Sequence, residues 1–231
     1  MKNKFIKLIA LLFFFSLSSS FAGDRTQSYD YKGFQYVSVG YGMEIDISQS
    51  DNYSIKVSAD ERDFQFLKVE KDGEELKFYI DKNNYHKKGE INIKITMPVL
   101  TEINLSGGSI GNIDMNVSSK DFNCDLSGGA ILNGDLQCAD IEIELSGGSQ
   151  VTLKGSGKNT EIDGSGGSIF QLKDFKVNNA DVSLSGGSQC SIYMNGSLNA
   201  NQNGGSQLTY YGRADIRNTS FSGGSGIRKG D

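Results

Sequence analysis

The chain repeats one short stretch, LSGGS, at residues 105–109, 145–149 and 184–188, and nearly intact as LSGGA at 126–130. Glycine pairs continue beyond these copies, and successive first glycines lie 18 to 21 residues apart. These first glycines are Gly107, Gly128, Gly147, Gly166, Gly186, Gly204 and Gly223. A fixed period of this length is typical of solenoids, in which each unit buries its apolar face against the next.

Apolar and polar residues alternate on both sides of each glycine pair. In IEIELSGGSQVTLKG (141–155), the apolar residues of one parity are Ile141, Ile143, Leu145, Val151 and Leu153. A period of two predicts strands. A flexible Gly/Ser linker would lack these apolar positions, and the L-x-x-L-x-L pattern of a leucine-rich repeat is missing. We therefore predict an all-β fold, a single-domain parallel β-helix solenoid of about seven coils of ~20 residues with an N-terminal β-rich cap.

The glycine pairs are predicted to be structural corners, where each coil bends and neighbouring backbones come close. The residues two before and two after each first glycine should face inward, and the column after the pair is uniformly small, Ser or Ala. Cys124 and Cys190 fall in inward columns three coils apart. At the spacing of strands this is too far for a disulfide, so both are predicted to fill space in the core.

The two ends of the chain differ from its middle. Residues 1–22 have the basic start, apolar run and small residues near the cut site of a signal peptide. Residues 23–100 contain few glycines and are predicted to form the β-rich cap or irregular first coils, with a hairpin about Asp72-Gly73. This segment should be continuous with the β-helix of residues 101–231. At the C-terminal end, Arg228 and Lys229 occupy expected inward positions, which predicts fraying or self-association through the last coil.

The charge of the mature chain argues against nucleic acid as a partner. Removal of the leader takes away three lysines, so the formal net charge goes from −5 to −8. No later stretch is apolar for long enough to span a bilayer as a helix. We expect an exported chain that needs no cofactor.

Few residues offer a catalytic chemistry. His86 is the one histidine and lies in a polar loop with no nucleophile placed beside it, so it is interpreted as an ordinary loop residue. Asp125, Glu144 and Asp163 stand three residues before a first glycine, on the outward parity of successive coils. Their carboxyl groups should lie about 5 Å apart, near the separation used by retaining glycosidases. Solvated surface, binding of a sugar or of a cation such as calcium, and catalysis all remain open for this column, and no metal site is assigned.

A second outward column consists of the residues just before each pair, among them Ser127, Ser146 and Ser165. An Ile/Gln column that includes Gln150 follows the pair. These hydroxyls either satisfy local backbone groups or form a flat strip on which a polymer docks.

Residues 91–113, INIKITMPVLTEINLSGGSIGNI, resemble the family called putative auto-transporter adhesin, head GIN domain. The resemblance covers about residues 34–226. It implies a right-handed parallel β-helix at the envelope or exterior of a Gram-negative bacterium, in the periplasm or at the cell surface, and it carries over no catalytic residues.

From these observations we predict a non-enzymatic exported module for binding, adhesion or structure at the cell envelope. Its expected partner is a glycan or another cell-surface polymer. The alternative is a polysaccharide-active enzyme, a lyase or glycosidase, that uses the stacked carboxylates.

Overall fold

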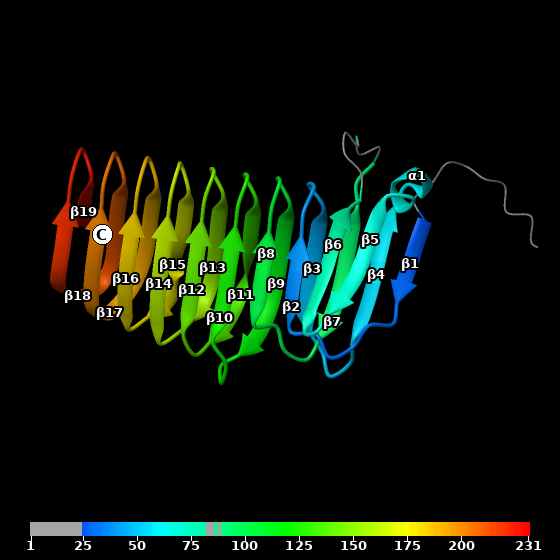
Figure 1. Cartoon of the computed structure of the whole chain (residues 1–231). Coiled ribbons are helices and arrows are strands. Elements are labelled where there is room, and N and C mark those ends of the chain that lie inside the picture. Colours follow the sequence, from blue (N-terminus) through cyan, green and yellow to red (C-terminus); the bar gives the residue numbers. More distant parts are fainter. Residues whose placement is uncertain (1–24, 82–85, 87–88) are drawn as a thin grey trace, which may run out of the picture.

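The computed structural model describes residues 25–81, 86 and 89–231, so the predicted leader lies outside the described residues. The chain is almost entirely β-strand and winds into a stack of coils (Figure 1). The N-terminal elements are β1 (Arg25–Tyr29), β2 (Tyr36–Val39), β3 (Glu44–Gln49), β4 (Ser54–Ala59), α1 (Glu61–Phe64), β5 (Leu67–Asp72), β6 (Glu75–Ile80) and β7 (Asn92–Met97). The coils that follow confirm the predicted all-β solenoid.

Each coil contributes one strand to each of two faces. The first face contains β8 (Glu102–Leu105), β10 (Phe122–Leu126), β12 (Ile141–Leu145), β14 (Asn159–Gly164) and β16 (Asn179–Leu184). The second face contains β9 (Ile110–Val117), β11 (Ile131–Cys138), β13 (Gln150–Ser156), β15 (Ile169–Val177) and β19 (Gly226–Lys229). The long strands β17 (Gln189–Gln202) and β18 (Gln207–Phe221) run through both faces.

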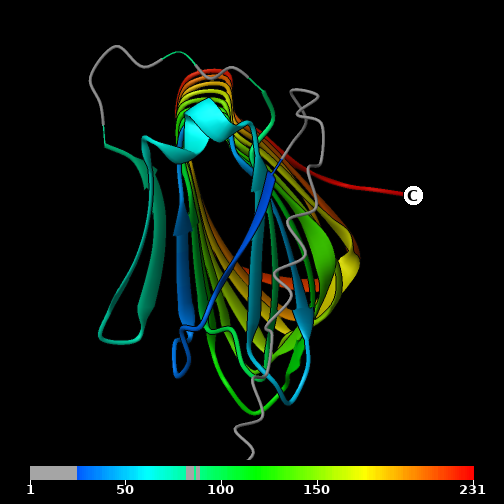
Figure 2. The same cartoon turned by 90° about the vertical axis from the view of Figure 1, so that its right-hand side faces the viewer.

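Strands of successive coils pair in parallel and in the register that the repeat predicts. Leu126 pairs with Leu105 on one side and with Leu145 on the other. Viewed along the stack, the coils superpose and the two faces meet at a narrow corner (Figure 2). The glycine pairs are therefore equivalent positions in successive coils.

The first glycine of each pair lies in the left-handed region, with φ between +59° and +75°. A Cβ atom at Gly186 would lie 2.5 Å from the backbone oxygen of Gly166, so both the conformation and the close approach require glycine there. The inward serine after the pair closes the turn, as when Ser149 Oγ donates to the Ser146 carbonyl at 2.7 Å. Each glycine pair thus lies where its coil turns from the first face to the second. The glycines themselves lie at the surface because the positive φ interrupts the strand alternation.

The interior consists of stacked columns of apolar side chains. The small inward column after each pair is fully buried from Ser109 to Ser206. Where Gly164 interrupts the leucine column before the pair, the Phe170 ring fills the space, since a Cβ at Gly164 would lie 2.7 Å from that ring.

All three cysteines are free and buried, as predicted for Cys124 and Cys190. Burial raises the pKa of the Cys138 thiol to about 12, so the thiol stays protonated at neutral pH.

One coil lacks a glycine pair and lies within residues 23–100, where irregular first coils were predicted beside the cap. Its turn is Gly40-Tyr41-Gly42, between β2 and β3. Val39, just before this turn, pairs with Leu105, just before the first glycine pair, so the two turns are equivalent positions of neighbouring coils. Tyr41 occupies the first-glycine position, with φ +61°, and its backbone stacks on Gly107.

The N-terminal end is covered by antiparallel strands. β4 pairs with β1 and β7, and β5 pairs with β6 in the predicted hairpin, whose turn glycine, Gly73, has φ +57°. β2 pairs with β6 and with β8, so pairing crosses the predicted limit between the cap and the β-helix. The domain limits themselves stay a prediction.

The expectation of a frayed last coil is wrong. β19 pairs with β18 in register: Ile227 takes the inward position beside Leu208, and Arg228 points outward, where its Nε donates to Thr209 Oγ1 at 3.0 Å. Phe221, predicted to be inward, belongs to an inward column, yet it is 42% exposed because no coil stacks on it.

Candidate functional site

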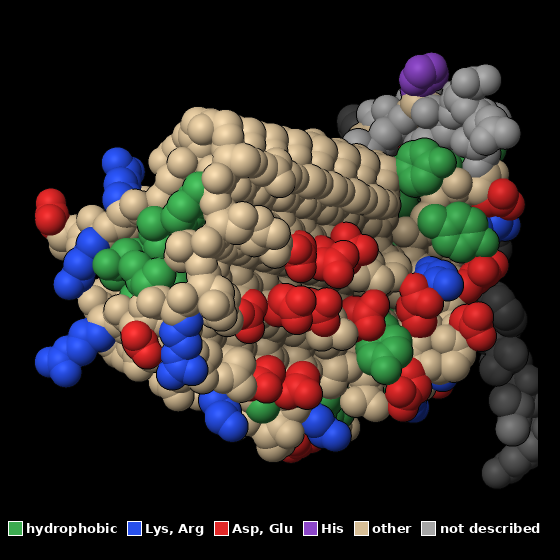
Figure 3. All heavy atoms as spheres, turned by 60° about the vertical axis from the view of Figure 1, so that its left-hand side comes forward, with side chains coloured by type: hydrophobic (Ala, Val, Ile, Leu, Met, Phe, Trp, Pro, Cys, Tyr) green, Lys and Arg blue, Asp and Glu red, His purple; other side chains and the backbone are tan. Residues whose placement is uncertain are grey.

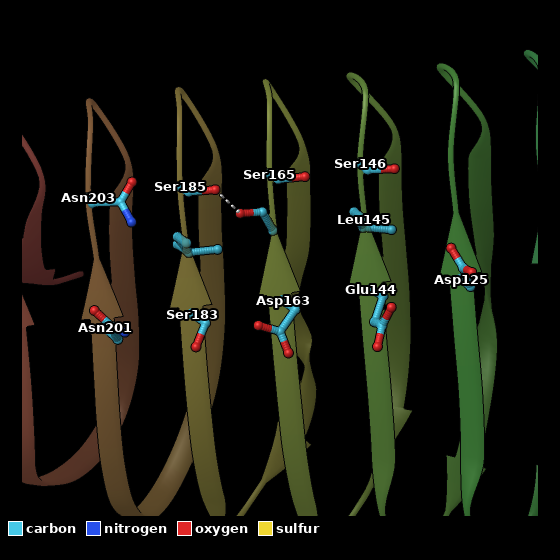
Figure 4. Close-up of a pocket in the computed structure, with 12 residues that line it drawn as sticks. Asp125, Glu144, Leu145, Ser146, Asp163, Ser165, Ser183, Ser185, Asn201 and Asn203 are labelled. Carbon is cyan, nitrogen blue, oxygen red and sulfur yellow. Dashed lines mark hydrogen bonds between the residues drawn. The ribbon is translucent and has the colours of Figure 1, made fainter.

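The predicted carboxylate column exists on the first face. Asp125 pairs with Glu144 and Glu144 with Asp163, so the three side chains project from neighbouring strands β10, β12 and β14. Ser183 and Asn201 continue the column toward the C-terminal end (Figure 4). Figure 3 shows the acidic side chains gathered in rows on this side of the molecule, next to the corner, whose side chains are small.

A shallow groove runs beside the corner, across the strands. Its outer wall is the column from Asp125 to Asn201, and its inner wall is the column of Ser146, Ser165, Ser185 and Asn203. In each strand, the residue between the two walls points into the core, so only its backbone forms the floor of the groove, as at Gly164. The volume is about 350 Å³. We call it the corner groove.

The first face is strongly acidic. Its strands β8, β10, β12, β14 and β16 carry seven outward carboxylates and no Lys or Arg. The carboxylates are Glu102, Asp125, Glu142, Glu144, Glu161, Asp163 and Asp181. Partial burial and the charges of four neighbouring carboxylates, Asp125 first, raise the pKa of Glu144. The groove therefore favours neutral or cationic ligands and repels anionic ones.

The outward serines do not make the hydrogen bonds that close the corners. The hydrogen bonds that close the corners come from the inward serines, such as Ser168 Oγ to the Ser165 carbonyl at 2.6 Å. Among the outward ones, Ser185 Oγ donates to the Gly164 carbonyl at 3.2 Å. Ser146 and Ser165 line the corner groove, and Ser127 lies farther toward the N-terminal end.

The structure separates Gln150 from the other predicted site residues. Gln150 begins β13 on the second face, where it pairs with Ile131 and Ile169. The Ile/Gln column thus exists, but it lies across the corner from the carboxylates and does not line the groove.

The arrangement differs from that of a glycosidase. Two catalytic carboxyl groups flank the scissile bond, whereas Asp125, Glu144 and Asp163 stand in one row on one wall, opposite serines and asparagine. His86 is exposed and lies between β6 and β7 in the sequence. Within residues 25–81, 86 and 89–231, no group of three or more His, Cys, Asp or Glu side chains is arranged to hold a metal ion.

Two tyrosines near the groove were not predicted as site residues. Tyr41 and Tyr79 line a second cavity at the N-terminal end of the first face, and this cavity shares Asp125 with the corner groove. The aligned turns VGYGM and LSGGS contain the signal for Tyr41, because they place a tyrosine where every other coil has glycine. Tyr79 comes from the β5–β6 hairpin, which the glycine period does not include.

The model of a protein family, described as putative auto-transporter adhesin, head GIN domain, matches residues 33–214. The chain belongs to this family. The match confirms the resemblance stated from the sequence, and its limits include both the Gly40-Tyr41-Gly42 turn and the coils that form the corner groove. Comparison with curated proteins gave no significant match.

Solved structures show the same fold in proteins of low identity. A putative adhesin from Bacteroides fragilis is 20% identical, with a TM-score of 0.83 over 89% of this chain and 96% of that chain. A putative lipid binding protein from Parabacteroides distasonis is 18% identical, with a TM-score of 0.72 over 90% and 97%. A putative adhesin from Parabacteroides merdae is 14% identical, with a TM-score of 0.69 over 90% and 97%. Within the described part of this head GIN domain chain, no helix has the length and hydropathy needed to cross a membrane.

Proposed function

We propose that the chain is an exported, non-enzymatic binding module of the cell envelope, whose corner groove holds an extended, hydroxyl-rich polymer. Adhesion is the role in the family's description. The leader sequence supports export to the periplasm or to the surface of a Gram-negative cell.

One observation supports this proposal more than the others. The corner groove is continuous over successive coils, and each coil places a polar side chain on each wall in the same register. Equivalent side chains recur at the strand spacing of about 4.8 Å. A polymer of regularly repeating units can therefore meet a hydrogen-bonding group on each wall at coil after coil.

The lining narrows the class of polymer. Carboxylates, hydroxyls and amides dominate the walls, which suits sugar hydroxyls and amines rather than lipid chains. The acidic side chains favour a neutral or amino-sugar glycan over an anionic one, because an anionic chain would add like charges beside Glu144.

The test is binding of glucosamine hexamers by calorimetry, with hexamers of N-acetylglucosamine and of galacturonic acid as neutral and anionic comparators. Ser165→Arg places a long side chain in the groove at an exposed position. Gln171→Arg, exposed on the second face of the same coil, is the matched control.

We expect Ser165→Arg to weaken binding of the amino-sugar or the neutral hexamer at least tenfold, and Gln171→Arg to leave it unchanged. Equal effects of the two variants, or preferential binding of the galacturonic acid hexamer, would contradict the assignment of the groove. The enzyme alternative predicts shortened hexamers after incubation, which the same samples reveal by mass spectrometry.

A further inference from the structure

The column of first glycines ends at Tyr41, a residue with a side chain in a backbone conformation that favours glycine. Tyr41 adopts φ +61°, and the seven stacked positions that follow are all glycine. A left-handed conformation is unfavourable for a residue with a Cβ atom. Tyr41 is also 52% exposed, so its ring does not compensate by filling the core. Backbone strain of this kind is concentrated at ligand-binding sites.

Tyr41 is sterically possible because of its place at the end of the column. A Cβ atom built on each later first glycine points at the backbone of the preceding coil, as Gly128 does toward Gly107. Among the described residues no glycine-pair turn precedes Tyr41, and by the same geometry its Cβ atom points toward the side of β6. The position thus tolerates a side chain, but glycine would serve the fold equally well.

The Tyr41 side chain lines a cavity of about 470 Å³. Tyr79 of β6 lines the same cavity together with Lys77, Asn104, Asp125 and Ser127. Figure 3 shows green side chains beside the acidic ones at the end of this face that lies near the grey residues.

A glycine opens the space for this cavity. Gly40 takes the place of the outward serine in its coil, and a Cβ there would lie 3.1 Å from Ser106 Oγ. In β6, Tyr79 directly follows Phe78, which pairs with Val39, so Tyr79 continues the serine column beyond Gly40. The serine column therefore leads to an aromatic ring.

The polar groups around the two rings are held in place. Lys77 Nζ lies 2.8 Å from a Glu75 carboxylate oxygen, and Ser38 Oγ donates to the other carboxylate oxygen at 2.6 Å. A hydrogen bond with the Glu70 carboxylate fixes the Tyr79 hydroxyl and raises its pKa.

We propose that this cavity, here called the tyrosine subsite, binds one sugar ring at the end of a polymer that lies in the corner groove. Aromatic faces pack against the C–H face of a sugar ring, while the amide, carboxylate and hydroxyls around them bond to its hydroxyls. Asp125 lines both cavities and connects them. The proposal rests on the proposed function and adds to it the place where the polymer ends, against the cap.

The test uses Tyr41→Gly, which restores the glycine of the other coils and is expected to leave the melting temperature unchanged. Tyr193→Thr removes an outward tyrosine from the second face and is the control. The probes are the dimer and the hexamer of glucosamine, with the N-acetylated forms as neutral comparators. Binding is measured by calorimetry and by near-ultraviolet circular dichroism, which reports tyrosine rings in a chain without tryptophan.

We expect Tyr41→Gly to weaken both dimer and hexamer at least tenfold and to remove the dichroism change, and Tyr193→Thr to behave as the unaltered chain. Ser165→Arg should weaken the hexamer and spare the dimer. If Tyr41→Gly binds both lengths normally while Ser165→Arg loses the hexamer, the tyrosine subsite is wrong and the groove stands. If Tyr41→Gly loses both probes and Ser165→Arg binds the hexamer normally, the subsite stands without the groove. No binding of any probe by the unaltered chain overturns both proposals.

Discussion

The repeated corner predicts that the two glycines of one pair respond very differently to the same substitution. Gly186 has φ +68°, and an added Cβ would lie 2.5 Å from the Gly166 oxygen. At Gly187 the conformation is an ordinary one, and the added Cβ would lie 3.6 Å from the same oxygen, a normal contact. Gly186→Ala and Gly187→Ala therefore form a matched pair, one residue apart in the same turn.

The expected magnitude follows from two contributions. A left-handed alanine costs about 1–2 kcal/mol, and moving backbone to relieve an overpacked contact costs about 1–3 kcal/mol. Gly186→Ala should thus destabilise the chain by about 2–5 kcal/mol, or lower its melting temperature by about 4–20 °C for a domain of this size. Gly187→Ala should be neutral or stabilising by about 0.4–1 kcal/mol, because alanine restricts the unfolded chain.

A third variant separates the two contributions. Gly148 has φ +85°, yet no atom lies within 4 Å of an added Cβ, so Gly148→Ala should cost only the strain of about 1–2 kcal/mol. Thermal unfolding followed by circular dichroism measures all three variants. Melting temperatures of Gly186→Ala and Gly187→Ala within about 2 °C of each other would refute the close packing of corner on corner.

Two further predictions concern single side chains. Gln202 is buried in the column of Leu184 and Phe221, and its amide has no hydrogen-bond partner among the described residues. Gln202→Leu should therefore raise the free energy of unfolding, measured in urea, by about 1–3 kcal/mol. An unchanged or lowered free energy of unfolding would contradict the unpaired amide. Because the pKa of Glu144 is raised in the folded chain, its ionisation costs stability at pH values above that pKa and costs nothing below the ordinary value of 4.5. Glu144→Gln should then stabilise the chain by about 0.5–1 kcal/mol at pH 7 in low salt and have no effect at about pH 3.5; an equal effect at both pH values would show that repulsion is not the cause.

The sequence predicted the parts of the fold that follow from the period of about 20 residues. Glycine spacing and alternation were enough to place Asp125 beside Glu144, because in-register stacking leaves one neighbour for each residue. Tyr41 was missed because its turn has no glycine pair, although aligning VGYGM with LSGGS places it at the first-glycine position, as the paired backbone shows. Gln150 was placed at the edge of the serine strip because it recurs at a fixed offset after the glycine pair, although the corner turns the chain onto the other face.

The last coil shows a different limit of sequence reasoning. Arg228 was predicted to be a poor interior residue, although it lies five positions after Gly223, an outward offset in the other coils. Ile227 lies four positions after Gly223 and pairs with Leu208, which lies four positions after Gly204, so Ile227 fills the inward position. The regular offsets therefore hold in the last coil, and the wrong prediction came from the facing assigned to one residue in a segment with few apolar side chains.

The uniform register has a consequence for the reach of the molecule. Removal of residues 147–165 would join Ser146 to Gly166, recreate LSGGS and take out 19 residues, one whole winding, with every remaining strand on its original side. Coils can therefore be added or removed one at a time. The length of the β-helix can change by whole coils in engineered versions without redesign of the interior. If a coil of the corner groove is removed, the longest oligomer that the groove binds should become shorter.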